Sequence, residues 1–310
     1  MNSTSRPQQV AAVDALRFAT IEAGGTKFNV GIGGRDGEVY DQAQFATRSP
    51  AETIGDVTSW LDTEVEKGGP LAAIGVATFG PIDTDPASAR WGHLGLTPKL
   101  SWRGADLITP FRRYGVPLAL DTDVNGAALA EWRWGAGRGC ARICYLTVGT
   151  GIGGGAVLDG KMLSGRSHPE MGHMFVRRHP DDEFVGACPT HGDCLEGLAS
   201  GNTIKARWGR SLSRLEVGHP GHLVVASYLA QACLNIVATL APEKIILGGG
   251  VMGTPGLVAN VRDQFNLLAN GYFSGFGAEH IALAELFPIS GLVGGLAIAE
   301  LALNQNQNFI

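Results

Sequence analysis

Two aspartates, Asp121 and Asp123, occupy positions at which a carboxylate could do chemistry. They follow a short apolar segment, 117–120, and precede a segment with helical periodicity, 126–132. In open α/β sheets, functional groups lie where a strand ends and the next helix begins. A carboxylate at this point could accept a proton from a hydroxyl group as that group attacks a γ-phosphate. It could equally cap the helix, because aspartate is a good N-cap residue. The residues alone leave both interpretations open.

Three short glycine-rich turns could approach an anion closely, because no Cβ atom shields their N–H groups. They comprise Gly24, Gly25, Thr26 and Lys27; Gly149, Thr150 and Gly151; and Gly248, Gly249 and Gly250. A strand rather than a helix follows each of the first two, so neither is a Walker loop or a dinucleotide fingerprint. Two opposed turns suit a nucleotide polyphosphate in a cleft between two lobes, with the third turn near the nucleoside. Each turn taken singly could also be an ordinary hairpin turn.

Two histidines and two cysteines have the spacing of a metal site. The set is His173, Cys188, His191 and Cys194, at intervals of fifteen, three and three residues. Two imidazoles and two thiolates suit a tetrahedral zinc ion with no open position, which would be structural. His168 and His179 are alternatives for the remote ligand, and two free thiols beside a surface histidine are the alternative without a metal. The five cysteines are odd in number and follow no secretion signal, which argues against a disulfide framework.

The composition is that of a globular protein. Of the 310 residues, 45% are hydrophobic and 17% are charged, which is enough to build a large core in two lobes. The net charge of −5 gives no reason to expect a nucleic acid or an anionic membrane as partner. The N-terminal residues are polar, and no segment has the roughly 18 consecutive apolar residues of a membrane span. We therefore expect a soluble, cytoplasmic protein in which the residues before about 18 are disordered or docked as an extension.

Strands and helices that would position these residues alternate along the chain. Hairpin patterns at 18–34 and 143–158 have the same form, one in each half, and suggest a duplicated α/β unit, with coincidental glycine turns as the alternative. Helical patterns cover 52–67, 222–240 and 292–303, and apolar strand patterns cover 71–78 and 244–247. Such alternation predicts open sheets flanked by helices.

Taken together, these motifs resemble the ROK family of sugar kinases and repressors. The segments that carry the resemblance are EAGGTK (22–27), DTDVNGAALAE (121–131), LTVGTGIGGG (146–155), EMGH (170–173), CPTHGDCLEG (188–197) and LGGGVM (247–252). The resemblance implies an α/β fold of two actin-like (ribonuclease H-like) lobes with a cleft between them and a zinc-clamped loop in the larger lobe. The smaller lobe would comprise 1–122 with 293–310, and the larger lobe 123–292 would hold the nucleotide. ATP would lie in the cleft with Mg²⁺ on its phosphates.

The resemblance also implies a role for individual residues. Asp123 matches the family's catalytic aspartate and would deprotonate a sugar hydroxyl. The ATP-binding residues would be Gly24, Gly25, Thr26, Lys27, Thr147, Gly149, Thr150, Gly151, Gly248, Gly249 and Gly250. The sugar-binding residues would be Gly80, Pro81, Thr122, Asp123, Glu170, His173 and Glu196. The zinc ligands would be His173, Cys188, His191 and Cys194, and the metal would hold Glu170 and Glu196 in position.

Departures from the common family pattern are similar to the bacterial fructokinase branch. His191 replaces a residue of the usual cysteine cluster, Glu22 stands where many members have aspartate, and Thr122 stands where glucokinases carry a glucose-binding asparagine. The segments TFGPID and 91–107 also look similar to fructokinases. The resemblance therefore implies ATP-dependent phosphorylation of D-fructose to fructose 6-phosphate by a homodimer, with mannose, glucose or allose as alternative substrates.

Two other classes of protein are weighed against the kinase. A sugar-responsive ROK transcriptional regulator would need a helix-turn-helix domain, and only about 19 residues precede the first hairpin pattern. A nicotinamide-dependent dehydrogenase would need a glycine motif that opens a helix, with an acidic residue about 20 positions further on, and the sequence has none.

Overall fold

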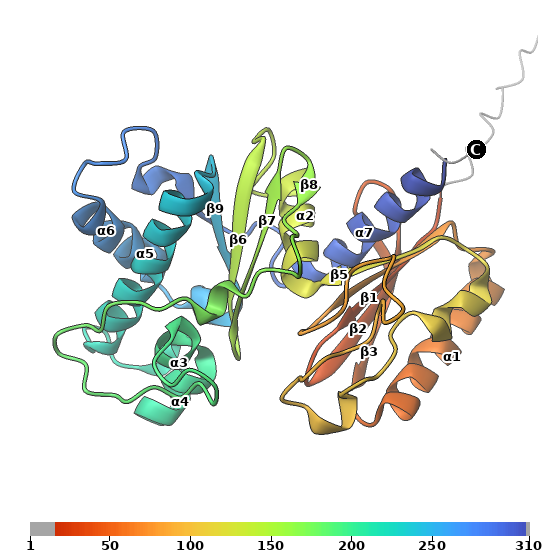
Figure 1. Ribbon diagram of the computed structural model, residues 1–310, viewed down its shortest axis with the longest axis horizontal. Helices are drawn as coiled ribbons and strands as arrows, with labels where there is room; N and C mark the ends of the chain where they lie inside the picture. Colours follow the sequence, from red (N-terminus) through yellow and green to blue (C-terminus); the bar gives the residue numbers. More distant parts are fainter. Residues whose placement is uncertain (1–15, 308–310) are drawn as a thin grey trace, which may run out of the picture.

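The computed structural model describes residues 16–307, which form two lobes, each built on a five-stranded sheet (Figure 1). The strand order is β3-β2-β1-β4-β5 in the first sheet and β10-β9-β6-β7-β8 in the second. In each sheet the first three strands in chain order pair antiparallel, and the last two extend the sheet in parallel beside the first strand. The two topologies are the same, which confirms the predicted duplication. The expectation that the residues before about 18 are disordered or docked as an extension concerns mainly residues 1–15, which lie outside the described residues.

The strands of the first sheet are β1 (Phe18–Ala23), β2 (Lys27–Gly33), β3 (Val39–Ala46), β4 (Ala73–Thr78) and β5 (Leu118–Thr122). Those of the second are β6 (Arg142–Val148), β7 (Ile152–Leu158), β8 (Lys161–Met162), β9 (Lys244–Gly248) and β10 (Ile281–Leu283). The central strands β1, β4 and β6 are almost wholly buried, as parallel strands covered on both faces must be.

Helix α1 (Pro50–Gly68) covers one face of the first sheet. Ser49 and Glu52 form a reciprocal capping box at its N-terminus, and Val57 and Leu61 are fully buried in the core of this lobe. The segment between β4 and β5 has no long helix and contains two 3₁₀ helices, Leu100–Trp102 and Thr109–Tyr114. This irregular segment forms much of the cleft wall on the side of the first lobe.

Two helices, α2 (Asp123–Trp134) and α7 (Ser290–Gln307), pack against each other between the sheets (Figure 1). Glycines permit this close approach: a Cβ atom on Gly294 would lie 2.5 Å from the Gly126 carbonyl carbon. A Cβ atom on Gly75 of β4 would lie 2.0 Å from the Gly295 oxygen. The small residues of the helix predicted at 292–303 therefore serve to bring α7 against both α2 and the first sheet.

Buried Glu131 ties the end of α2 to the segment that leads into α7. Its carboxylate accepts hydrogen bonds from Ala136 N (2.9 Å), Leu286 N (2.9 Å), Glu285 N (3.2 Å) and Ser290 Oγ (3.2 Å). Four donors around one fully buried carboxylate satisfy most of its acceptor capacity. The two places where the chain passes between the lobes are thus joined by one side chain.

The second lobe contains α3 (Leu195–Ala199), α4 (Gly201–Trp208), α5 (Gly221–Leu240) and α6 (Leu257–Ala269). It also has 3₁₀ helices at Met171–His173, Leu212–Arg214, Gly250–Gly253 and Ala278–His280. Among the described residues, α5 is the one helix long and apolar enough to cross a membrane, but 61% of its most apolar stretch is buried within the lobe. It is the central core helix of that lobe, packed against α6. The division of the chain at residues 122 and 293 stays a prediction; it falls at the end of β5 and within α7.

Candidate active site

Asp123 is the first residue of α2, directly after β5, so its side chain lies where the first sheet meets the cleft. Thr122 caps the helix, because its hydroxyl accepts a hydrogen bond from Asn125 N at 3.2 Å. Burial of Asp123, together with the negative charges of Glu22 and Glu170, raises its pKa to about 7. A carboxylate whose pKa lies near neutral pH is well suited to act as a general base.

Asp121 has a different place from Asp123. Its Oδ1 accepts hydrogen bonds from Thr122 N (2.7 Å) and from Asn125 Nδ2 (2.9 Å), and the side chain is 8% exposed. Burial raises the pKa of Asp121 against the lowering effect of these bonds. Of the two aspartates, Asp121 therefore orients the start of α2, whereas Asp123 is the one that faces the cleft.

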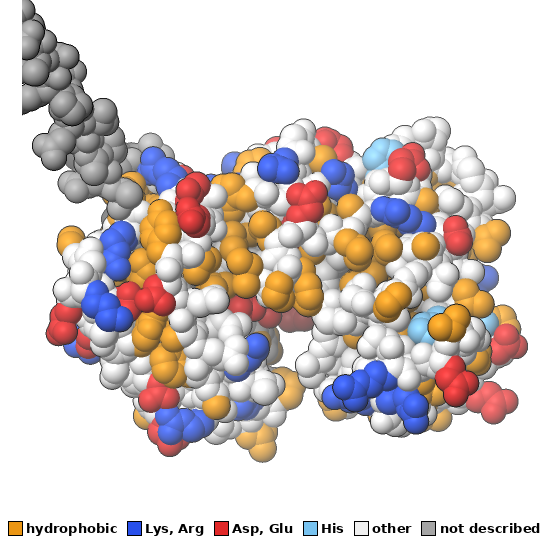
Figure 2. Space-filling model, turned by 180° about the vertical axis from the view of Figure 1, so that it is seen from behind, with side chains coloured by type: hydrophobic (Ala, Val, Ile, Leu, Met, Phe, Trp, Pro, Cys, Tyr) orange, Lys and Arg blue, Asp and Glu red, His pale blue; other side chains and the backbone are white. Residues whose placement is uncertain are grey.

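A cavity of about 370 Å³ lies between the lobes at Asp123. The first lobe contributes Phe79 and Gly80 to it, and the second lobe contributes residues of the second glycine turn and two glutamates. The predicted site residues that line this cavity are Gly80, Thr122, Asp123, Thr147, Gly149, Thr150, Gly151, Glu170 and Glu196. Figure 2 shows, from behind, the notch between the two lobes at one edge of the molecule.

The second glycine turn is held from two sides. Gly149 N donates to Gly151 O at 2.9 Å, and Gly201 N at the start of α4 donates to Gly149 O at 2.7 Å. Glu196 Oε2 accepts from Ile152 N at 2.9 Å, and a Cβ atom on Gly151 would lie 2.5 Å from that same oxygen. Gly151 is thus needed for packing, whereas a Cβ atom on Gly149 would meet no atom within 4 Å.

The third turn, 248–250, packs directly behind the second. Gly249 has φ of 87°, and a Cβ atom there would lie 2.5 Å from Val148 O at the end of β6. A Cβ atom on Gly248 would lie 2.2 Å from Tyr145 Oη. Gly248, Gly249 and Gly250 therefore lie beside the second turn, although they are not among the residues that line the 370 Å³ cavity.

The first turn, at the end of the β1–β2 hairpin, is an exposed tight turn in which Gly24 N donates to Lys27 O at 3.0 Å. Gly24, Gly25, Thr26 and Lys27 do not line the cavity at Asp123. Lys99, from the segment between β4 and β5, fixes the turn. Its Nζ donates to Gly25 O at 2.7 Å and to Thr47 O at 3.0 Å. Sequence reasoning missed Lys99, since nothing in its local pattern marks it.

Glu22, just before the first turn, is a second residue that sequence reasoning left without a role. It accepts a hydrogen bond from Asn29 Nδ2 at 2.7 Å, and burial raises its pKa. Its negative charge in turn raises the pKa of Asp123, so the two carboxylates are close enough to interact. The signal was present in the sequence, because Glu22 opens the motif EAGGTK.

The glycine run in β7 has a packing cause. A Cβ atom on Gly153 would lie 2.9 Å from Val124 Cγ1, one on Gly154 would lie 2.6 Å from Met171 Sδ, and one on Gly155 would lie 2.6 Å from Asn125 Oδ1. The start of α2 and the segment after Glu170 therefore press against this strand. The run allows the N-terminal end of α2, which carries Asp123, to lie close to the second sheet.

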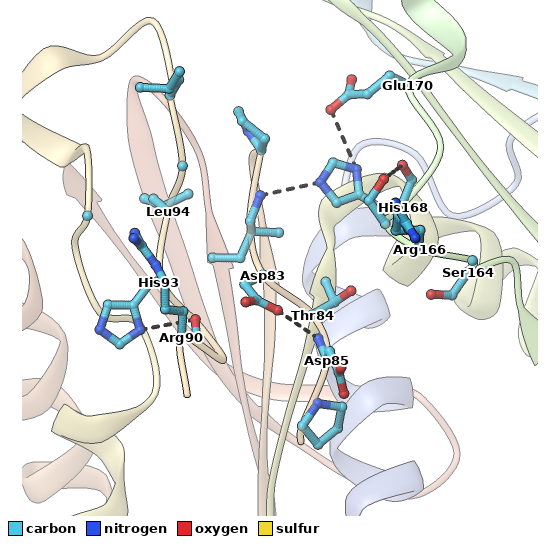
Figure 3. Close-up of a pocket in the computed structure, with 18 of the residues that line it drawn as sticks. Asp83, Thr84, Asp85, Arg90, His93, Leu94, Ser164, Arg166, His168 and Glu170 are labelled. Atoms are coloured by element: carbon cyan, nitrogen blue, oxygen red, sulfur yellow. Dashed lines mark hydrogen bonds and ion pairs between the residues drawn. The ribbon is translucent and has the colours of Figure 1, made fainter. Parts of the chain in front are cut away.

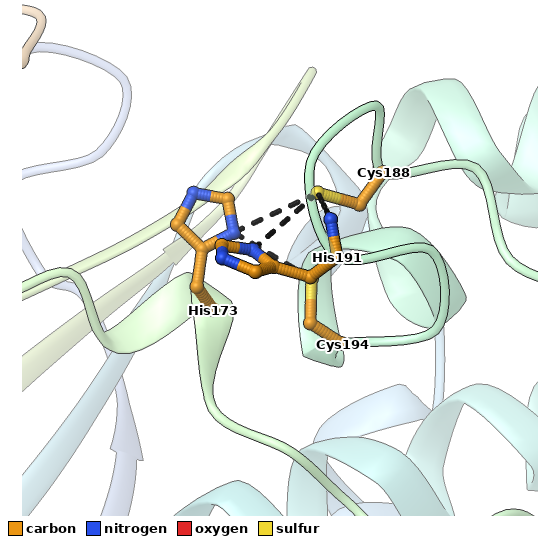
Figure 4. Close-up of side chains that lie close together, drawn as sticks. All are labelled: His173, Cys188, His191 and Cys194. Atoms are coloured by element: carbon orange, nitrogen blue, oxygen red, sulfur yellow. Dashed lines mark hydrogen bonds between the residues drawn. The ribbon is translucent and has the colours of Figure 1, made fainter.

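His173, Cys188, His191 and Cys194 form a compact group in the second lobe (Figure 4). His173 Nδ1 lies 3.5 Å from Cys194 Sγ and 3.8 Å from Cys188 Sγ, and His191 Nδ1 lies 3.9 Å from Cys188 Sγ. Ligands of a tetrahedral zinc ion, at about 2.0–2.3 Å from the metal, lie roughly 3.3–3.8 Å from one another. The donor set and spacing fit zinc, and they identify His173 as the remote histidine in place of the alternatives His168 and His179.

The metal group lies between the segments that carry the two glutamates. Glu170 precedes the 3₁₀ helix Met171–His173, and its carbonyl oxygen accepts from His173 N at 3.0 Å. Glu196 belongs to α3, which begins directly after Cys194, and Leu195 N donates to Met174 O at 2.8 Å. A metal ion on this group would fix both glutamates relative to the cavity.

Pro81 and its neighbours line a larger hollow of about 1,220 Å³, which adjoins the cavity at Asp123. Residues 81–96 of the first lobe and residues 164–170 of the second lobe face each other across it (Figure 3). His168 and Glu170 line both spaces. Pro81 is thus the one predicted sugar-binding residue that lies in the larger hollow only, and His173 lies in neither space.

Comparison with known proteins gives consistent matches over almost the whole chain. The sequence matches the ROK family over residues 18–302. A fructokinase of Zymomonas mobilis is 42% identical and covers 94% of this chain and 99% of its own length; a fructokinase of Pediococcus pentosaceus is 38% identical, with 93% and 99% covered. The crystal structure of the ROK hexokinase from Thermus thermophilus has a TM-score of 0.75 at 26% identity, over 94% of this chain and 100% of that one.

Proposed function

The chain belongs to the ROK family, and on that premise we propose that it is an ATP-dependent kinase that phosphorylates the 6-hydroxyl of D-fructose. Relatives named fructokinase at 38–42% identity over more than nine tenths of the chain support this substrate. The observation that carries the proposal is the cavity in which Asp123 faces the second glycine turn across the interlobe cleft. One wall offers a base and the opposite wall offers N–H groups for phosphates.

Asp123 would accept the proton of the 6-hydroxyl as the hydroxyl oxygen attacks the γ-phosphorus of ATP. The bond from that phosphorus to the β–γ bridging oxygen breaks, and ADP leaves. The pKa of about 7 leaves a substantial fraction of Asp123 ionised and able to take the proton at neutral pH. Thr122 and Asn125 hold the start of α2, and through it the position of the base. Catalysis of phosphoryl transfer depends mainly on such positioning and on charge stabilisation.

ATP would lie along the second lobe, with its phosphates between the two glycine turns that end β1 and β6. The proposed ATP ligands are Gly24, Gly25, Thr26, Lys27, Thr147, Gly149, Thr150, Gly151, Gly248, Gly249 and Gly250. The like charges of Glu22 and Asp123 fit a divalent cation nearby, because that cation would relieve the repulsion that adds to burial in raising the pKa of Asp123. Mg²⁺ held there with the phosphate oxygens would neutralise the charge that develops during transfer.

The hexose would lie between Asp123 and the two glutamates of the second lobe. The proposed sugar ligands are Gly80, Pro81, Thr122, Asp123, Glu170, His173 and Glu196. The side chains of Glu170 and Glu196 line the same cavity as the base, and carboxylates are suitable acceptors for several sugar hydroxyls. Since His173 lies outside both spaces, its contribution to sugar binding would be through the metal group.

Zinc on His173, Cys188, His191 and Cys194 would be structural. The group has four protein ligands, so a bound ion has no position open for substrate. Its role would be to clamp 170–196 into the shape that presents both glutamates. We also propose that the enzyme acts in the cytoplasm as a homodimer without a nucleic acid or membrane partner.

The test is a screen of free hexoses at fixed ATP and Mg²⁺, with ADP release coupled to NADH oxidation. We expect fructose to give the highest kcat/KM, NMR of the product to show phosphate on carbon 6, and Asp123→Asn to remove nearly all turnover. Higher kcat/KM with mannose, glucose or allose would assign a different hexose to the same site. If no hexose is phosphorylated, and DNA is bound at low salt, the kinase proposal fails in favour of a regulator.

A further inference from the structure

His168 lines both spaces of the cleft, and Figure 3 shows it beside Glu170 in the larger one. Its side chain is only 6% exposed, although it comes from a surface segment of the second lobe. The sequence left His168 open as an alternative metal ligand, but in the structure it lies outside the metal group. A buried histidine next to a proposed sugar ligand therefore has no role in the site as described so far.

One ring nitrogen of His168 bonds to the opposite lobe. Ile82 N donates a hydrogen bond to His168 Nε2 at 3.3 Å, in a buried position. The loop that carries Ile82 is itself fixed, because Gly95 N donates to Pro81 O at 2.7 Å and Ile82 pairs with Leu94. His168 is thus anchored across the cleft to a well-supported backbone N–H group.

This bond determines which nitrogen of His168 carries the proton. Because Nε2 accepts a hydrogen bond, it carries no proton itself. In the neutral ring the proton therefore lies on Nδ1. Nδ1 faces two acceptors, Glu170 Oε1 at 3.5 Å and Pro169 O at 3.5 Å. The network therefore assigns the proton to Nδ1, which has Pro169 O as its hydrogen-bond acceptor and Glu170 Oε1 within ion-pair distance.

The Glu170 carboxylate is half exposed, and His168 is its one ion-pair or hydrogen-bonding side-chain partner among residues 16–307. Gly80 makes room for the pair: a Cβ atom there would lie 3.2 Å from His168 Cε1 and 3.5 Å from Glu170 Oε1. The Gly80–Ile82 loop of the first lobe thus lies against both His168 and Glu170 of the second lobe. Contacts of this length in a ligand-free site commonly shorten when substrate binds.

We propose that His168 is a positioning residue for the acceptor sugar: it holds the Glu170 carboxylate toward the sugar and sets that orientation from the Ile82 backbone of the opposite lobe. The inference rests on the proposed sugar-binding role of Glu170. It assigns His168 to recognition of the sugar, with no contact to ATP. Loss of the Nδ1 donor should weaken sugar binding and leave nucleotide binding unchanged.

Two amide variants separate the two nitrogens. An asparagine amide lies near the position of Nδ1, so His168→Asn keeps a donor toward Glu170 and loses the acceptor for Ile82. A glutamine amide reaches the position of Nε2, so His168→Gln keeps the bond to Ile82 and loses the donor toward Glu170. Both are polar and similar in size, which makes each a matched control for the other.

We expect His168→Gln to raise the KM for fructose about tenfold, the effect of one lost hydrogen bond to a charged group. We expect His168→Asn to raise it about threefold, and both variants to keep the KM for ATP within about twofold and melting temperatures close to each other. In a Glu170→Gln background, the effect of His168→Gln should largely disappear, because His168 acts through Glu170.

The outcomes separate failure of this inference from failure of the function. If Glu170→Gln leaves the KM for fructose unchanged, the sugar role of Glu170 is wrong. If Glu170→Gln raises it but His168→Gln does not, or His168→Asn is the worse variant, the positioning role of His168 is wrong. Equal rises in the KM values for fructose and ATP, or additive effects of His168→Gln and Glu170→Gln, would indicate a general structural role and overturn the proposal.

Discussion

Replacement of Asp123 by asparagine should abolish most activity and yet stabilise the fold. The base role predicts a fall in kcat of about 100-fold to 10,000-fold. The stability effect follows from the pKa of about 7 in the folded protein, against the ordinary value of 3.8 that the side chain regains on unfolding. Between about pH 4 and pH 7, the folded state keeps a proton that the unfolded state has released, so the stability of the native enzyme falls as pH rises through this window.

The full difference between those two pKa values corresponds to about 4 kcal/mol. Above about pH 7 the side chain is ionised in both states, so the loss of stability in the native protein reaches about this value at pH 8. The asparagine variant stays neutral, and its amide keeps an oxygen for the Val124 N–H group that bonds to Asp123 Oδ1 at 2.9 Å. Its advantage in free energy of unfolding should grow from pH 5 to about pH 7 and be constant above that.

Equilibrium urea unfolding of both proteins at pH 5, 6, 7 and 8, with coupled kinase assays on the same samples, measures both effects. Asp263→Asn, on the exposed face of α6, is the matched control and should change neither quantity. If Asp123→Asn keeps more than a tenth of the activity, Asp123 is not the base. If its stability advantage does not increase with pH, the argument from the raised pKa is refuted.

Three further predictions concern other parts of the molecule. The kcat/KM for fructose should fall about tenfold per pH unit below about pH 7, as Asp123 becomes protonated; a flat profile down to pH 5.5 would contradict this. Cys188→Ser should lower the melting temperature, the affinity for fructose and the zinc content, the last measured by plasma mass spectrometry. Cys140→Ser, outside the metal group, should lower none of them. An unchanged melting temperature after verified zinc loss would exclude a structural metal. Glu131→Gln should lower the free energy of unfolding by about 2 kcal/mol, because an amide nitrogen would then face a backbone N–H group. The same change at exposed Glu279 should have little effect. Equal effects of the two changes would show that the Glu131 network adds no stability.

Much of the fold could be predicted because local patterns and tertiary structure agree. The helix predicted at 52–67 is found at 50–68, that at 222–240 at 221–240, and both glycine hairpins are present. The helix predicted at 126–132 begins earlier, at Asp123, because its N-cap residue is Thr122. Helices α3, α4 and α6 were not predicted; α3 and α4 are short, and their positions depend on the metal group and the second glycine turn.

The candidate site was predicted where one motif carries several of its residues, as with Asp123 or the metal group. It could not be predicted where partners lie far apart in sequence. Lys99 fixes a turn more than 70 residues away, and His168 bonds to a backbone group 86 positions earlier. The glycines of β7 show a related limit: their pattern predicted a strand, but the contacts with α2 and Met171 that require glycine there come from other parts of the sequence.

The position of α7 in the chain has a consequence for biosynthesis. Phe18 and Ala73 of the first sheet are covered by Leu296, Ala299 and Ala302 of α7, which is synthesised after the other elements of residues 16–307. The sheet that is synthesised first therefore keeps an apolar face uncovered until the last helix has emerged, whereas the second sheet has all its strands by residue 283. The second sheet can therefore assemble before α7 covers the first, and we expect the uncovered face of the first sheet to be exposed during that interval.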